Sequence, residues 1–100
     1  NEIFSAQTMK TKRARIVEVR VWFTCRIIQL HRGNGLVEEG EPLCRVESLF
    51  PWVREDIKSP APGYLRWVEG IEKMAEKLLE ERPWLEPGEL IATIKPPVQI

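Results

Sequence analysis

Few side chains in this sequence have the type and spacing that chemistry requires. Cys25 and Cys44 are its two cysteines, and they lack the CxxC spacing of a zinc or redox site. His31 is the single histidine and lies in a glycine-rich turn without a nearby serine or cysteine nucleophile. Glycine motifs that bind phosphates or dinucleotides are absent. We therefore predict no catalytic residue and no metal site, and we expect a protein that is not an enzyme.

Both cysteines lie in apolar segments that resemble strands. Such residues are typically small buried hydrophobic groups. A disulfide between facing strands is the alternative, and sequence spacing alone does not decide between the two states.

The net charge of the chain limits which classes of partner it can bind. Fifteen Lys and Arg balance fifteen Asp and Glu, and this zero net charge argues against a nucleic-acid binder. Cations dominate residues 10–20 and glutamates dominate residues 69–89. We interpret residues 1–15 as a flexible basic arm before a single domain over residues 16–100. An arm that contacts an acidic partner or nucleic acid is the alternative.

The hydrophobic segments are short. None approaches the length of a membrane span, and the first fifteen residues lack the apolar block of a signal peptide, so we expect a cytoplasmic protein. The glutamate-rich composition with eight prolines is typical of heat-adapted proteins.

The hydrophobic pattern predicts mainly strands. Apolar and polar residues alternate from Ile16 to Ile27, which predicts a long strand with a bend or a break near residues 22–24. Further strands are predicted, between turns rich in glycine and proline, over residues 43–47, 53–58, 64–68 and 90–94. One segment changes period: apolar residues at helical spacing predict a helix over residues 71–82 that ends before Pro83.

An internal repeat is the strongest signal. Residues 37–46 align without gaps with residues 85–94, and each copy is a glycine turn that leads into a short strand. Three positions are identical, namely Glu38 and Glu86, Gly40 and Gly88, and Glu41 and Glu89. Because these glutamates recur, turn chemistry explains them better than acid–base catalysis. The repeat predicts two halves that pack about an approximate twofold axis.

This arrangement resembles the biotinyl/lipoyl domains. Their pattern runs through a VxxG turn, an apolar segment with a glutamate, a modified lysine and S/A-P-x-x-G. Here it is matched by Val37–Gly40, Pro42–Glu47 and Ile57–Gly63, and the resemblance covers roughly Arg20 to Pro96. It implies a mostly-β barrel-sandwich hybrid of two quasi-symmetric halves, here with one inserted helix at about 71–82.

The chain departs from this family where the cofactor is attached. The carriers place their acceptor lysine at the tip of the hairpin between the halves, a few residues after the glutamate matched by Glu47. Here residues 48–52 read Ser-Leu-Phe-Pro-Trp, and Trp52 falls at the acceptor position. Biotin and lipoate are linked as amides to a lysine amine, so we predict no cofactor. Lys58, at the far end of the next strand, is a poor acceptor.

The resemblance without the lysine leads to the functional hypothesis. We expect a non-catalytic binding or scaffolding module whose partner is a protein, with Leu49, Phe50 and Trp52 as the candidate partner-binding tip. These side chains could instead fold back onto the sheet or the helix. Alternative functions are a biotin or lipoate carrier modified at Lys58, and an unmodified lipoyl-like domain of a larger membrane-associated complex. An archaeal protein fits the composition best, and the oligomeric state is left open.

Overall fold

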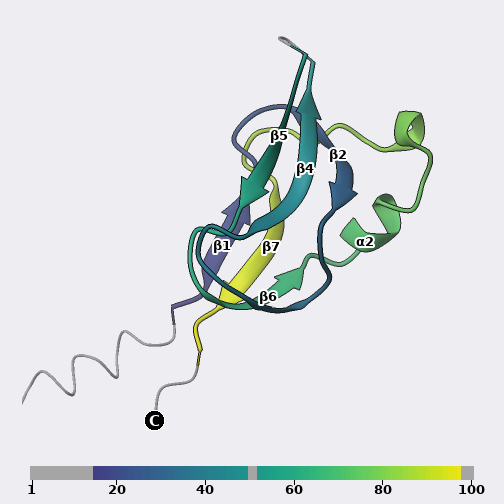
Figure 1. Cartoon of the computed structure of the whole chain (residues 1–100). Coiled ribbons are helices and arrows are strands. Elements are labelled where there is room, and N and C mark those ends of the chain that lie inside the picture. The colour runs from purple at the N-terminus through teal and green to yellow at the C-terminus, as the bar shows by residue number, and fades with distance from the viewer. Residues whose placement is uncertain (1–14, 50–51, 98–100) are drawn as a thin grey trace, which may run out of the picture.

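The computed structural model describes residues 15–49 and 52–97, and strands dominate it (Figure 1). The expectation of a mostly-β protein is confirmed. The predicted basic arm lies outside the described residues except for Arg15. In chain order the elements are β1 (Val17–Arg20), β2 (Cys25–Leu30), β3 (Gly35–Val37), β4 (Pro42–Ser48), β5 (Val53–Lys58), β6 (Gly63–Trp67), the helix α2 (Ile71–Met74), the 3-10 turn η1 (Leu79–Glu81) and β7 (Leu90–Lys95).

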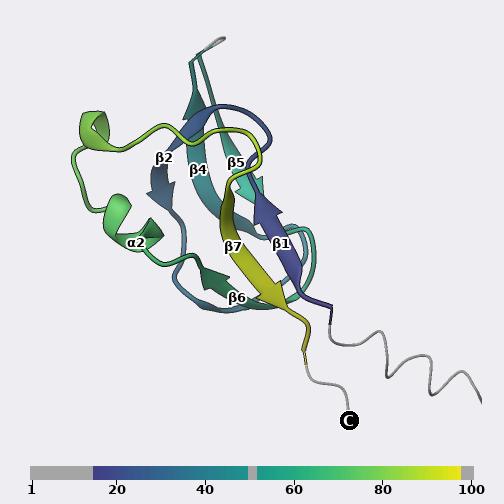
Figure 2. The same cartoon turned by 180° about the vertical axis from the view of Figure 1, so that it is seen from behind.

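The strands form two antiparallel sheets. One has the order β1-β7-β6-β3 and the other β2-β4-β5. Figures 1 and 2 view the molecule from opposite sides, with β4 and β5 in front in the first view and β1 and β7 in front in the second. Both sheets contribute to one buried core, whose largest fully buried apolar side chains are Ile27, Leu43, Ile57, Ile91 and Ile94. Each such side chain stabilises the fold by about 1.5–3 kcal/mol through removal from water.

The long alternating segment at the N-terminal end of the domain divides into two strands, as its predicted bend indicated. β1 belongs to one sheet and β2 to the other. Between them the chain crosses the end of the core, where Val21 and Cys25 are both buried. The bend therefore marks the point at which the chain changes sheets.

The two glycine turns of the repeat use the same hydrogen bonds. In the first turn the Glu38 N–H donates to the Glu41 carboxylate (3.0 Å), and the Glu41 N–H donates to the Glu38 carbonyl (3.1 Å). In the second turn Glu86 donates to the Glu89 carboxylate (2.7 Å), and Glu89 donates to the Glu86 carbonyl (3.1 Å). Each glutamate pair thus closes its own turn.

The turn glycines continue this correspondence. Gly40 and Gly88 have φ values of 85° and 95°, a conformation that other residues rarely adopt. The Gly40 N–H donates to the Ser59 carbonyl and the Gly88 N–H to the Val21 carbonyl, both at 2.8 Å. Ser59 and Val21 therefore occupy equivalent places in the two halves.

The halves also share their strand register. Residues 37–48 correspond to residues 85–96, with β5 in the place of β1 and β2 in the place of β6. The matching antiparallel pairs are Pro42–Lys58 with Leu90–Arg20, Cys44–Ile57 with Ala92–Val19, Val46–Glu55 with Ile94–Val17, and Val46–Ile27 with Ile94–Leu65. The sequence repeat is therefore also a repeat of the hydrogen-bonding pattern.

The predicted helix over residues 71–82 is wrong in its extent. The α-helix ends at Met74, Leu78 is extended, and only the short η1 follows. The Arg82 guanidinium donates to the Lys77 carbonyl and to the Ile27 carbonyl of β2 (both 2.9 Å). The Arg82 side chain thus forms hydrogen bonds where a continued helix would have backbone hydrogen bonds, and it connects the segment after α2 to β2. A helix this short gains little from its own hydrogen bonds, so this tertiary contact prevails.

The two ends of the molecule contain different strand ends. β4 ends and β5 begins at one end of the molecule, and β1 begins and β7 ends at the other (Figure 1). Within residues 15–49 and 52–97 there is no helix with the length and hydrophobicity needed to cross a bilayer.

Candidate partner-binding groove

The predicted tip residues that the structure describes are exposed. Trp52 is 59% exposed and Leu49 is 36% exposed, while Phe50 lies outside the described residues. Trp52 is therefore not folded back under cover of the sheet or the helix.

An apolar groove of about 620 Å³ lies beside the tip. One wall belongs to the loop between β1 and β2, and the other belongs to the β4–β5 hairpin. Of the predicted tip residues Leu49 borders this groove, and Trp52 does not. The side chains on which the site depends are Trp22, Phe23 and Thr24 of the loop, and Leu49, Val53 and Glu55 of the hairpin.

The β1–β2 loop is held firmly at its two ends. The Val21 N–H donates to the Glu89 carbonyl (3.1 Å), and Cys25 exchanges two backbone hydrogen bonds with Leu85 (3.0 and 2.6 Å). Between these anchors the Trp22 side chain projects outward and is 63% exposed. Its ring contacts that of Phe23 edge-on, with the centroids 5.4 Å apart. The loop thus presents an aromatic side chain to solvent on a fixed backbone.

Sequence reasoning missed this loop as part of a site and interpreted it only as a bend. Two adjacent aromatic residues at a break in strand alternation were the available signal. The equivalent loop of the other half, Ser59–Gly63, contains Pro60, Ala61 and Pro62 and has no aromatic ring. The aromatic wall therefore distinguishes the two otherwise similar halves.

Acidic groups dominate the electrostatics of the groove. Among the described residues that line it, Glu55 is the only one with a charged side chain. Next to the groove, the Thr24 hydroxyl donates to the Glu86 carboxylate (3.3 Å). The negative charges of Glu55 and Glu89 also act on the Cys25 thiol behind the loop. The groove therefore combines apolar walls with one carboxylate, that of Glu55, and a second carboxylate, that of Glu86, is hydrogen-bonded to its wall.

The two cysteines are free thiols buried in the core. Burial, reinforced by nearby negative charge, raises the pKa of Cys25 to about 11. Burial in the same way raises the pKa of Cys44 to about 12. Both thiols are protonated at neutral pH, so neither has the character of a reactive nucleophile.

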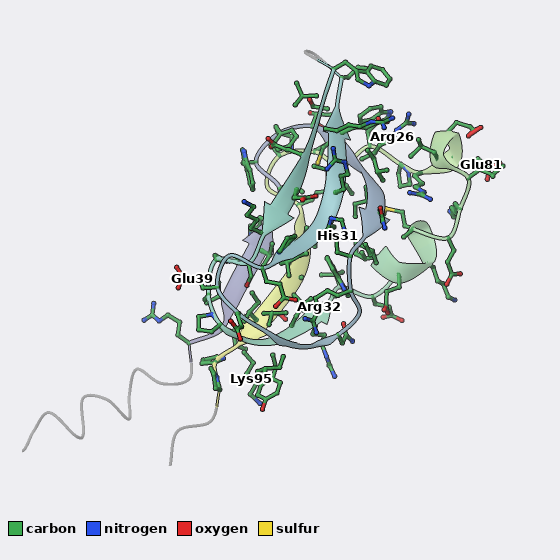
Figure 3. All side chains as sticks on the ribbon, viewed as in Figure 1. Arg26, His31, Arg32, Glu39, Glu81 and Lys95 are labelled. Atoms are coloured by element: carbon green, nitrogen blue, oxygen red, sulfur yellow. The ribbon has the colours of Figure 1, made fainter. Side chains whose placement is uncertain are left out.

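The outer face of the three-stranded sheet has a different composition. Glu47 is completely buried there, 2.7 Å from the Arg26 Nε and 3.3 Å from the Arg54 Nε. The Arg26 guanidinium also lies 4.7 Å from the centroid of the Trp84 ring. Figure 3 shows Arg26 toward the tip end of this sheet and His31 farther from the tip. The Glu47 carboxylate thus pairs with two arginines and is shielded from solvent, which indicates a structural role.

His31 belongs to a second ionic group on the same face. Its Nε2 lies 2.9 Å from the Asp56 Oδ1, and Arg45 approaches the same carboxylate at 3.6 Å. The hydrogen bond from His31 is the main cause that holds the pKa of Asp56 below its ordinary value. Among the described residues no cluster of three or more His, Cys, Asp or Glu side chains is suited to hold a metal ion. His31 therefore lies in a salt-bridge network rather than in a nucleophilic site.

Lys58 lies apart from the tip. It is the last residue of β5, is exposed, and faces Pro42 of β4. It lies five residue steps along β5 from Val53, a distance of roughly 17 Å in an extended strand. The structure thus does not bring this amine to the hairpin tip.

Comparisons of this chain with protein-family models, with curated proteins and with solved structures found no match.

Proposed function

We propose that this chain is a non-catalytic protein-interaction module with a lipoyl-like fold. In this proposal the hairpin that would carry biotin or lipoate in a carrier instead forms one wall of a binding groove. The shared turn hydrogen bonds and the shared strand register of the two halves support a barrel-sandwich hybrid. The position of the hairpin tip, opposite the start of β1 and the end of β7, also fits such a fold (Figure 1).

The sequence of the tip argues against a carrier role. Residues 48–53 contain no lysine, and amide attachment of either cofactor requires a lysine amine. Lys58 lies at the opposite end of β5, beside Pro42. A ligase that recognises an exposed hairpin tip would not find its acceptor there.

The observation that carries the proposal is the exposed aromatic wall of the groove. Trp22 is 63% exposed on a loop whose two ends are fixed by backbone hydrogen bonds. Exposed aromatic side chains next to an apolar hollow are typical of binding surfaces, because they bury a large area without much loss of conformational entropy.

Selection from a random-peptide phage library tests the proposal. The full chain is immobilised through a C-terminal tag, because β7 ends away from the β4–β5 hairpin (Figure 1). Enriched peptides are synthesised, and their binding is measured by fluorescence anisotropy. We expect Trp22→Ser to weaken their binding at least about tenfold, a loss of about 1.4 kcal/mol. Leu78→Ser is the matched control, because Leu78 is 65% exposed and does not line the groove.

Two outcomes would contradict the proposal. One is equal binding of the selected peptides to Trp22→Ser and to the wild type, while circular dichroism shows both to be folded. The other is a mass increase on Lys58 after incubation with biotin ligase or lipoate ligase and the corresponding cofactor. Intact-mass measurement is expected to show an unchanged chain.

A further inference from the structure

We infer that the groove binds an extended, apolar segment of a partner protein that carries a lysine or arginine opposite Glu55. This inference rests on the proposed function and specifies the chemistry of the partner. Three features of the structure lead to it, namely the state of Glu55, the distribution of charge over the two faces of the hairpin, and the free edge of β5.

Glu55 is a carboxylate without a counterion in the described part of the chain. It lies in β5 opposite Val46 and lines the groove together with Val53. Neither a hydrogen bond nor an ion pair joins its side chain to any residue in 15–49 or 52–97. A partner that covers the apolar walls would also remove water from this carboxylate. Such desolvation is unfavourable unless the partner supplies a positive charge.

The remaining carboxylates of the hairpin show that this arrangement is specific to the groove. On the outer face Glu47 has two arginine partners, and Asp56 has His31 and Arg45. Arginines and His31 thus compensate the carboxylates of the outer face, whereas no described lysine or arginine lines the groove.

The neighbouring carboxylates strengthen the negative potential. Glu86 accepts a hydrogen bond from Thr24, a residue of the groove wall. Glu89 and Glu55 both act on the same buried thiol, that of Cys25. A cation in the groove would be attracted by these charges and by the face of the exposed Trp22 ring. Cations are therefore favoured over neutral or acidic side chains.

The edge of the sheet favours an extended segment. β5 is an outer strand that pairs, among the described strands, with β4 alone. Its backbone can accept one further strand, and alternate residues of an added strand point to the same side. Val53 and Glu55 are two residues apart and both line the groove. A segment that pairs with β5 would therefore bring alternate side chains, apolar and basic, over the groove.

Charge reversal tests this inference. In the peptides selected against the wild type we expect one enriched lysine or arginine position. Its replacement by methionine should weaken binding about tenfold, and replacement by glutamate should weaken it further. With Glu55→Lys the preference should invert, so that the glutamate peptide binds more tightly than the lysine peptide. Glu80→Lys is the control for the change in net charge, because Glu80 is exposed on η1 and does not line the groove.

The outcomes separate this inference from the proposed function. If selected peptides depend on Trp22 but show no basic position, and Glu55→Lys binds them like Glu80→Lys, the inference is overturned and the interaction module remains. If Trp22→Ser weakens the binding of no selected peptide, the proposed function itself is contradicted, and the inference about Glu55 falls with it.

Discussion

Glu47 is the charged side chain on which the hairpin most depends. It is fully buried, although it lies on the outer face of the sheet, because Arg26 and Arg54 cover it from the two neighbouring strands. Arg26 in turn stacks on Trp84, so that one carboxylate links β2, β4, β5 and the segment before β7. Removal of one partner from such a group leaves the others buried and uncompensated.

Glu47→Gln is expected to lower the free energy of unfolding by about 2 kcal/mol, less than for a fully enclosed pair because Arg54 is half exposed. Chemical denaturation followed by tryptophan fluorescence measures this change. Glu80→Gln on η1 is the matched control and should remain within about 0.5 kcal/mol of the wild type. Equal unfolding midpoints for the two variants would show that the Glu47 network is dispensable.

The β5–β6 turn is constrained by close packing against β7. Gly63 has a φ of 149°, and a Cβ atom at this position would lie 2.3 Å from the Lys95 carbonyl oxygen of β7. This glycine ends the Ser-Pro-Ala-Pro-Gly segment that was noted in the sequence. A glycine is required at position 63 because the backbone of β7 passes close to it, and not only because of the turn conformation.

Gly63→Ala is therefore predicted to destabilise the protein by about 3 kcal/mol, through the clash and the unfavourable backbone conformation. Thermal unfolding measured by circular dichroism tests this. Gly33→Ala is the control, since its Cβ would meet only the Glu72 carboxylate at 3.7 Å and its φ is not in the left-handed region. Similar melting temperatures for the two variants would contradict the close approach of β6 to β7.

The arrangement of the whole chain places both cysteines in one core between the two sheets. Cys25 and Cys44 are fully buried, and the pKa values of their thiols are raised to about 11 and about 12. A thiol reagent reacts only with a thiol that it can reach and that is ionised to the thiolate. In the folded protein at pH 8 both thiols are buried and protonated, so neither condition is met. Their reactivity thus reports on opening of the core as a unit.

We predict that the native chain at pH 8 reacts with Ellman's reagent only as fast as it unfolds, and that two thiols react at once in denaturant. Absorbance of the released thiolate measures both rates. Glu47→Gln should accelerate the slow reaction, because it increases the population of the open state. Immediate labelling of either cysteine in the folded wild type would show that the core is not closed.

The parts of the protein that local sequence predicts are those with local causes. The two glycine turns are recognisable because Glu38 and Glu41, or Glu86 and Glu89, bond to each other within four residues. Strands with alternating apolar residues are likewise predicted by their own pattern, including the bend between β1 and β2. The absence of a lysine from residues 48–53 needs no structure at all.

Other features depend on segments that are distant in the chain. The predicted helix stops at Met74, and the segment after it is tied to the sheet by Arg82, which reaches the carbonyl of Ile27, 55 residues away. The groove exists because packing of the sheets brings Trp22 beside Val53, and Glu47 is buried because Arg26 covers it from another strand. Periodicity and turn chemistry contain no information about such contacts, since these depend on how two sheets pack. Local pattern thus predicts most strands and the repeat, whereas tertiary packing decides the extent of the helix and which side chains remain exposed.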